Sequence, residues 1–303
     1  MSLKRSSLAA LALAFFVAVT VFVMKAPKLS EAAVTPTRAM ITATPVTKPV
    51  PAASLTAANP TLSAQARPWL ETLKKFNAAR SYRAFLYDMD RNRSEGALQY
   101  AMEVINICVN SLLGVQEASL TGAGQRDALA RLRSRCDMSQ AELETELTLM
   151  ASKMDRMDPA STRLLMAGSG FDHATTAAEE HHAVGAVLAT QDPTVMLRLA
   201  QAPTGQQGNM RYFLGSEHAS GSGSILEFAF RLAQCELGLD CGADSPLTLM
   251  LCVRSNWCAP SYRDALHLGL AHEPNRYAQI DTLAAQLVQQ MRSQNSAAFV
   301  REK

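Results

Sequence analysis

The sequence predicts an all-α protein with a single N-terminal transmembrane helix, a disordered tether and an irregular multi-helix domain with disulfides. An uncharged apolar run lies near the N-terminus, a Pro-, Ala- and Thr-rich stretch follows it, and apolar residues recur at helical spacing from Pro68 onward. Alternating β-branched runs are missing after residue 60, and aromatic residues make up 6% of the chain. We therefore expect short helices and little or no sheet over residues 67–303.

The N-terminus reads as a membrane anchor. Residues 1–5 form a cytoplasmic stub that contains Lys4 and Arg5, and residues 6–24 carry no charge. A helix of that length spans roughly 28 Å, close to the hydrocarbon thickness of a bilayer. Because basic residues stay inside, we expect a single-pass protein of the bacterial inner membrane with its C-terminal domain in the periplasm. The alternative is a cleaved signal peptide and secretion to the periplasm, although the run is long for that and lacks a good cleavage site.

Residues 25–66 predict a disordered linker, because the segment has no aromatic residue and cannot bury enough apolar surface to offset its ordering entropy. Residues 1–66 hold six basic side chains and one acidic side chain. Residues 67–303 keep 23 basic and 26 acidic side chains. A mildly acidic domain lacks the basic footprint that binding to a phosphate backbone needs, so we expect no nucleic-acid partner.

Three segments of residues 67–303 show helical apolar stripes. Apolar side chains at steps of three and four would share one helix face. The stripes are Leu98, Met102, Ile105, Val109 and Leu112; Leu143, Leu147, Met150, Met154 and Met157; and Ile280, Leu283, Leu287, Val288 and Met291. On the first of these helices, the other face is polar and consists of Gln99, Glu103, Asn106 and Asn110.

Helix starts are indicated by capping residues. Ser139 and Glu142 have the spacing of a capping box, in which each side chain bonds the other residue's backbone N–H. Asp192 and Ser245 each precede a proline, and a capping residue followed by proline is typical of a helix N-terminus.

Residues 202–224 depart from the helical pattern, because they contain five glycines. A long Gly-rich loop is either functional or a flexible connector, so we consider a sub-boundary near 202–224. The loop carries Arg211, Glu217 and His218, which are candidate ligand-binding residues.

The cysteines are the strongest local signal. An even number of cysteines in an exported chain indicates disulfides. All six lie in the domain, at Cys108, Cys136, Cys235, Cys241, Cys252 and Cys258. We expect a bridge between the first two and two bridges within the last four, whose pairing the spacing leaves open. That cluster would tie two antiparallel helices to each other and to their loops. Zinc is the alternative, although five residues between paired ligands is a loose spacing for it.

The run from Cys235 to Cys258, with the stretch from Tyr82 to Cys108, resembles uncharacterised exported proteins of Gram-negative bacteria. The likeness covers about half of the domain. It implies an envelope location and a helical fold, and it brings no known activity or functional residue.

Catalytic motifs are scarce. Glu179 and His182 would share a helix face near His173, which suits a metal site, but a solvated helix face is the simpler interpretation. Ser261, Asp264 and His267 have the residue types of a triad, yet Ser261 is better placed to cap a helix.

We therefore expect a non-catalytic, membrane-tethered envelope protein without cofactor or metal. Its helical domain would bind another envelope protein or a cell-wall component. The alternative is an envelope hydrolase or metal-binding enzyme that uses residues within 172–182 and 202–224.

Overall fold

The computed structural model describes most of the C-terminal domain. It covers residues 67–92, 94–112, 115–153, 158–169, 176–201, 210–219 and 223–300. The predicted anchor 6–24, the predicted linker 25–66 and the candidate His173 lie outside the described residues. Among the helices that are described, none has the length and apolar character needed to cross a bilayer.

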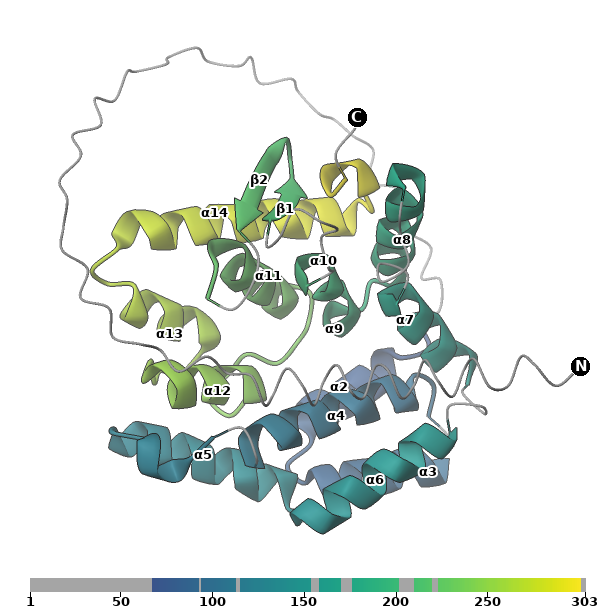
Figure 1. Cartoon of the computed structure of the whole chain (residues 1–303), viewed down its shortest axis with the longest axis vertical. Helices are drawn as coiled ribbons and strands as arrows, with labels where there is room; N and C mark the ends of the chain where they lie inside the picture. The colour runs from purple at the N-terminus through teal and green to yellow at the C-terminus, as the bar shows by residue number, and fades with distance from the viewer. Residues whose placement is uncertain are drawn as a thin grey trace, which may run out of the picture. The chain divides into compact units, whose positions relative to one another are not determined.

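The described part of the domain is helical apart from one hairpin, which confirms the predicted all-α class (Figure 1). Its first half contains α2 (Leu70–Ala78), α3 (Tyr82–Asn92), α4 (Ala97–Leu112), the 3-10 turn η1 (Glu117–Ser119), α5 (Ala123–Cys136), α6 (Gln140–Lys153), α7 (Pro159–Ser169) and α8 (Ala177–Thr190). Its second half contains α9 (Pro193–Met196), α10 (Arg198–Gln201), β1 (Met210–Phe213), β2 (Ser216–Ala219), α11 (Ile225–Glu236), α12 (Pro246–Ser255), α13 (Tyr262–Gly269), α14 (Pro274–Arg292) and η4 (Ser296–Ala298).

The helices begin where the capping residues predict. The Ser139 backbone N–H donates to Glu142 Oε2 at 2.7 Å, and the Glu142 N–H donates to Ser139 Oγ at 3.3 Å. Asp192 Oδ1 accepts the N–H of Thr194 at 2.8 Å, and Ser245 Oγ accepts the N–H of Thr248 at 3.2 Å. Each bond satisfies a backbone donor that the first turn leaves free.

One core joins the two halves of the domain, since its buried residues run from Trp69 to Val300. The α14 stripe is buried as predicted and packs against α11. In Figure 1, α2 to α6 lie together on one side of α12, and α11, α13 and α14 lie on the other. Helix α12 packs against both α5 and α13, so it connects the two groups of helices.

Part of the expected Gly-rich loop is a β-hairpin, and the expectation of a loop throughout 202–224 was wrong there. Strands β1 and β2 are antiparallel, and Phe213 pairs with Ser216 across a two-residue turn. Leu214 and Gly215 have φ values of 47° and 84°, as a tight hairpin turn with the twist of its strands requires. The Phe213 ring is buried 5.2 Å from that of Phe299, and this contact fixes the hairpin against the C-terminal segment.

The cysteines form the three bridges Cys108–Cys136, Cys235–Cys241 and Cys252–Cys258. The first bridge was predicted and ties α4 to α5, and the other two lie within the C-terminal cluster as expected. Each of those two joins the end of a helix to the loop that follows it. The expectation that they tie two helices to each other was therefore wrong.

Candidate functional site

A cleft lies between α4 on one side and α11 and α12 on the other. Its volume is about 290 Å³. Each of these helices lines it with residues three or four positions apart, so one face of each helix looks into the same space. The polar members of these faces are Glu103, Asn106 and Asn110 from α4, Glu227, Arg231 and Gln234 from α11, and Arg254 and Ser255 from α12.

The polar face of α4 therefore lines the cleft, where Glu103 and Asn110 are half-buried and Asn106 is exposed. The opposite face is also covered, because Val104, Ile105 and Cys108 are buried in the core. A helix buried on one side and facing a cleft on the other keeps an amphipathic pattern. The sequence marked Glu103, Asn106 and Asn110 as polar but gave no signal that they line a cleft.

Arg231 and Arg254 both line the cleft, and among the described residues only neutral side-chain oxygens bind them. Arg231 Nη1 donates to Gln234 Oε1 at 3.3 Å, and Arg254 Nη2 donates to Asn110 Oδ1 at 3.2 Å. Neither guanidinium has a carboxylate within 4.0 Å among the described residues. The amides hold both groups in place and leave their positive charge without a close counter-ion.

The pKa of Arg254 reflects the charges of Arg231 and of the nearby Glu227 carboxylate. Desolvation lowers the pKa of Arg254, Glu227 raises it, and Arg231 lowers it. Arg254 is exposed, so these effects on its pKa indicate that the three charged groups lie close together and carry no stability value. Two cations that lie close together form a favourable position for an anionic group.

Glu103 is the only carboxylate lining the cleft that bonds nothing in the described part of the chain. Glu227 Oε2 accepts the Gly223 N–H at 3.0 Å, and Asp240 Oδ1 accepts the Gly242 N–H at 3.0 Å. Glu103 has neither a hydrogen bond nor an ion pair within 4.0 Å to the described residues. Its two oxygens are therefore available to a donor that the protein does not supply.

The environment of Glu103 disfavours its charge. Burial raises the pKa of Glu103, and the more distant Arg198 and Arg231 oppose that rise while Asp192 adds to it. A carboxyl held in this way is typical of a functional site, although structural networks also perturb acids.

Beneath the cleft, Asp192 and Tyr100 form a buried hydrogen bond, with the Tyr100 hydroxyl donating to Asp192 Oδ2. Burial raises the pKa of both groups. Gln234 Nε2 donates to the Pro193 carbonyl at 2.6 Å, so the start of α9 is fixed to α11. This network holds Thr194, which lines the cleft, and Gln234, which orients Arg231.

Arg135 also lines the cleft and is 5% exposed. Its Nη1 donates to the Asp244 carbonyl at 2.8 Å and its Nη2 to the Asn77 carbonyl at 3.2 Å. Its guanidinium lies 5.1 Å from the centre of the Tyr82 ring, and burial raises the pKa of Tyr82 to about 12. Arg135 Nε and the Tyr82 hydroxyl have no partner among the described residues.

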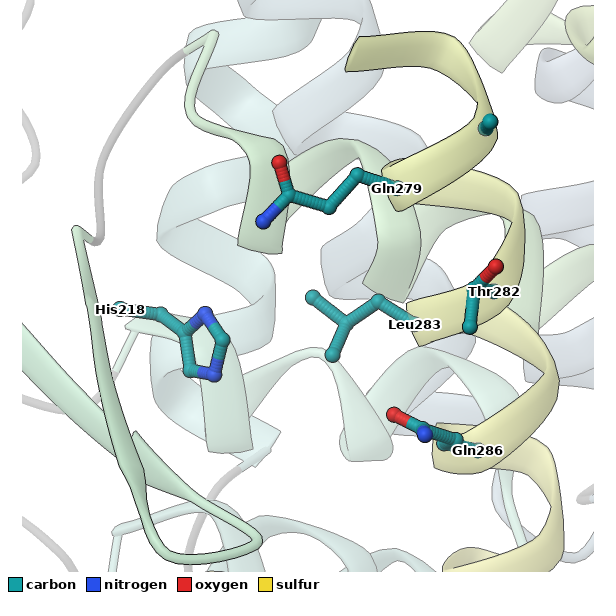
Figure 2. A pocket seen from close by; sticks show the side chains of 6 residues that line it. His218, Gln279, Thr282, Leu283 and Gln286 are labelled. Carbon is teal, nitrogen blue, oxygen red and sulfur yellow. The ribbon is translucent and has the colours of Figure 1, made fainter. Parts of the chain in front are cut away.

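A second hollow lies between β2 and α14 and has a volume of about 370 Å³. Figure 2 shows His218 pointing from the hairpin toward α14, which presents Gln279, Thr282, Leu283 and Gln286. This hollow opens broadly to solvent, and His218 is the one ionisable side chain among the described residues that line it. It lacks a second group to share proton transfer or to complete a metal site, so the α4–α11–α12 cleft is the better candidate.

The other candidates do not gather around His218. Glu179 accepts the Thr176 backbone N–H at 2.9 Å and so completes the cap of α8, and the exposed His182 lies one turn further along that helix. Glu217 lies in β2, and Arg211 lies in β1 with a side chain outside the described set. Within the described ranges, no group of three or more His, Cys, Asp or Glu could hold a metal ion.

The triad-like residues of α13 serve its cap. Ser261 Oγ accepts the Asp264 N–H at 3.1 Å and donates to Asp264 Oδ2 at 2.6 Å. His267 packs against the Tyr277 ring at 5.0 Å, and the Ser261 hydroxyl donates to Asp264 and not to His267. Ser261 therefore caps α13, as the sequence indicated.

Comparisons of the chain with protein-family models, with curated proteins and with solved structures give no match.

Proposed function

We propose that this chain is a membrane-tethered binding protein of the bacterial envelope, which holds a small polar ligand of the periplasm in the α4–α11–α12 cleft. The observation that carries the proposal is the set of unneutralised charges, Arg231, Arg254 and Glu103, gathered from three helices in one cleft. Half-buried charges without partners cost stability, so the retention of Glu103 and Arg231 beside the exposed Arg254 favours a ligand that pairs with them.

The proposed cellular location of this binding domain is argued mainly from the sequence. The apolar run 6–24 would anchor the chain in the inner membrane, and the linker 25–66 would let the domain reach periplasmic ligands. Three disulfides support an oxidising compartment, because such bonds form and persist there. A cell-wall component fits this location, as does a small molecule in transit.

The test is a thermal unfolding measurement on the full-length chain in detergent, with its disulfides intact. The low-molecular-mass fraction of a periplasmic extract should raise the Tm of the wild-type protein by about 5 to 10 °C if its ligand reaches 100 times Kd. Replacing both cleft arginines, as Arg231→Met with Arg254→Met, should abolish the shift. The matched control is Arg91→Met on the exposed surface of α3, which should keep it. An equal shift in all three proteins would contradict the proposal.

A second function, an envelope hydrolase, is favoured by Glu103 alone. A carboxyl whose pKa is raised by burial in a cleft can donate a proton to a leaving group. Loss of cell-wall or ester hydrolysis in Glu103→Gln, with the ligand-induced Tm shift retained, would favour this function over simple binding. The exposed positions of His182 and Glu217 offer less support to a hydrolase built on residues 172–182 and 202–224.

A further inference from the structure

The charges of the cleft have a polarity that restricts the ligand. Arg231 and Arg254, from adjacent faces of α11 and α12, present guanidinium groups that neutral amides orient. Glu103 lies on the opposite wall, in α4, with both oxygens unbonded in the described structure. A complementary ligand therefore carries an anionic group at one end and a hydrogen-bond-donating, cationic group at the other.

We propose that the cleft recognises the two charged ends of a free amino acid or short peptide, with the carboxylate at Arg231 and Arg254 and the ammonium group at Glu103. This inference rests on the proposed binding function and names its ligand class. Guanidinium groups bind carboxylates in a planar, two-bond geometry, and an ammonium group supplies three donors to a carboxylate.

The overall charge of the cleft favours such a zwitterion over a phosphate. Three carboxylates, Glu103, Glu227 and Asp240, line it with three guanidiniums, Arg135, Arg231 and Arg254. A dianion would be attracted by the arginines but repelled by the acids, and it would leave Glu103 without a donor. A neutral sugar would leave the charges on both walls without counter-ions.

The size and the remaining lining of the cleft point to a peptide with an apolar side chain. A volume of about 290 Å³ lies at the lower end of the range for small-molecule sites. Much of the wall is apolar and consists of Phe76, Ile107, Phe228, Leu247, Met250 and Leu251. A dipeptide with one aliphatic side chain would cover this surface while its ends reach the two charged walls.

The experiment is isothermal titration of the full-length chain in detergent with L-alanyl-L-leucine, its N-acetyl form and its C-terminal amide. We expect the free dipeptide to bind and each blocked form to bind about tenfold more weakly or worse, because each lacks one charged end. Inorganic phosphate and maltose are titrated as the competing ligand classes.

The variants assign each end of the peptide to its wall. In Glu103→Gln, the free and N-acetyl forms should bind equally, while discrimination against the amide persists. In the double variant Arg231→Met with Arg254→Met, the free and amide forms should bind equally, while discrimination against the N-acetyl form persists. A variant that is merely misfolded would lose both. Glu144→Gln, at an exposed site on α6, should discriminate as the wild type does.

Other outcomes would overturn the ligand class. One such outcome is that the free dipeptide binds no more tightly than both blocked forms. The other is that phosphate or maltose binds while the dipeptide does not. If none of the titrated compounds binds, the proposed ligand class is also wrong. The Tm shift with the periplasmic extract then decides whether the binding function itself stands. If the shift depends on Arg231 and Arg254, a small ligand of another class occupies the cleft. If no shift occurs, both proposals fail.

Discussion

At the scale of single residues, Glu103 links the stability of the fold to the cleft. Burial raises its folded pKa above the ordinary 4.5, so the folded chain holds this proton more tightly than the unfolded chain does. The protonated Glu103 side chain stabilises the fold fully at pH values below its unfolded pKa. This stabilisation is lost as the pH rises through the folded pKa. A neutral isostere at this position is spared that loss.

Glu103→Gln should therefore unfold at a higher Tm than the wild type near about pH 8, and the difference should shrink toward zero near about pH 4. Because the Tm of the wild type is subtracted from that of the variant at each pH, the contributions of the other titrating groups cancel. Thermal melts of the ligand-free protein at both pH values measure the effect. A variant that is less stable at both values would mean that Glu103 is a structural acid with a partner in the folded state.

Gly269 is a second position where one added atom matters, because a side chain there would collide with the Trp257 ring. A Cβ on Gly269 would come within 1.9 Å of the Trp257 ring, which packs 6.0 Å from Phe228. The backbone leaves no space for Cβ unless Trp257 moves. We expect Gly269→Ala to destabilise the fold by about 1 to 3 kcal/mol, as overpacked cores do, measured by denaturant unfolding. Gly185→Ala on α8, where Cβ meets nothing within 4 Å, is the matched control and should not destabilise.

At the scale of elements, the three disulfides close loops of very different length. Cys108–Cys136 spans 28 residues and joins α4 to α5, whereas each of the others spans 6. If bridges act by restricting the unfolded chain, the long one contributes about 3.6 kcal/mol and each short one about 2.2 kcal/mol. The long bridge also holds the Glu103 helix against the helix that carries Arg135.

Paired Cys→Ala replacements should follow that order. Loss of Cys108–Cys136 should lower the Tm more than loss of Cys235–Cys241 or Cys252–Cys258, and it should weaken binding in the cleft as well. Calorimetry of the three double variants, with dipeptide titration beside it, measures both effects. Equal losses from all three pairs would show that strain or burial outweighs the loop entropy.

The elements also show what could be predicted from the sequence. Ser139, Asp192 and Ser245 mark helix starts because caps are local hydrogen bonds, and the α14 stripe marks a buried face because its period is local too. The hairpin escaped prediction because its turn is Leu214-Gly215, which lacks the Asn-Gly or Asp-Gly signal, and docking of Phe213 stabilises it.

The cleft could not be predicted for a related reason. Glu103, Arg231 and Arg254 are far apart in the chain, and each lies on a helix whose own pattern is that of an ordinary amphipathic helix. Only the packing of α4, α11 and α12 brings their polar faces together. The sequence singled out residues such as His182 and Glu217 because their side chains are of types common in functional sites. In the structure both are exposed.

At the scale of the whole molecule, a main core shared by both halves of the domain argues against two independently folding parts. The sequence allowed a sub-boundary near 202–224, yet buried residues on both sides of it belong to one cluster that runs from Trp69 to Val300. Helix α12 packs on α5 as well as on α13, and the cleft takes walls from both halves. A part of the domain on its own would expose both that core and the charged walls.

The domain should therefore unfold in one cooperative transition. Differential scanning calorimetry of the full-length chain in detergent should give a calorimetric enthalpy equal to the van't Hoff enthalpy, at about 0.7 kcal/mol per ordered residue near 60 °C. A ligand of the cleft should move that transition as a unit, since it touches helices from both halves. Two separate transitions, only one of which responds to ligand, would place a domain boundary within 202–224 and assign the binding residues to one side of it.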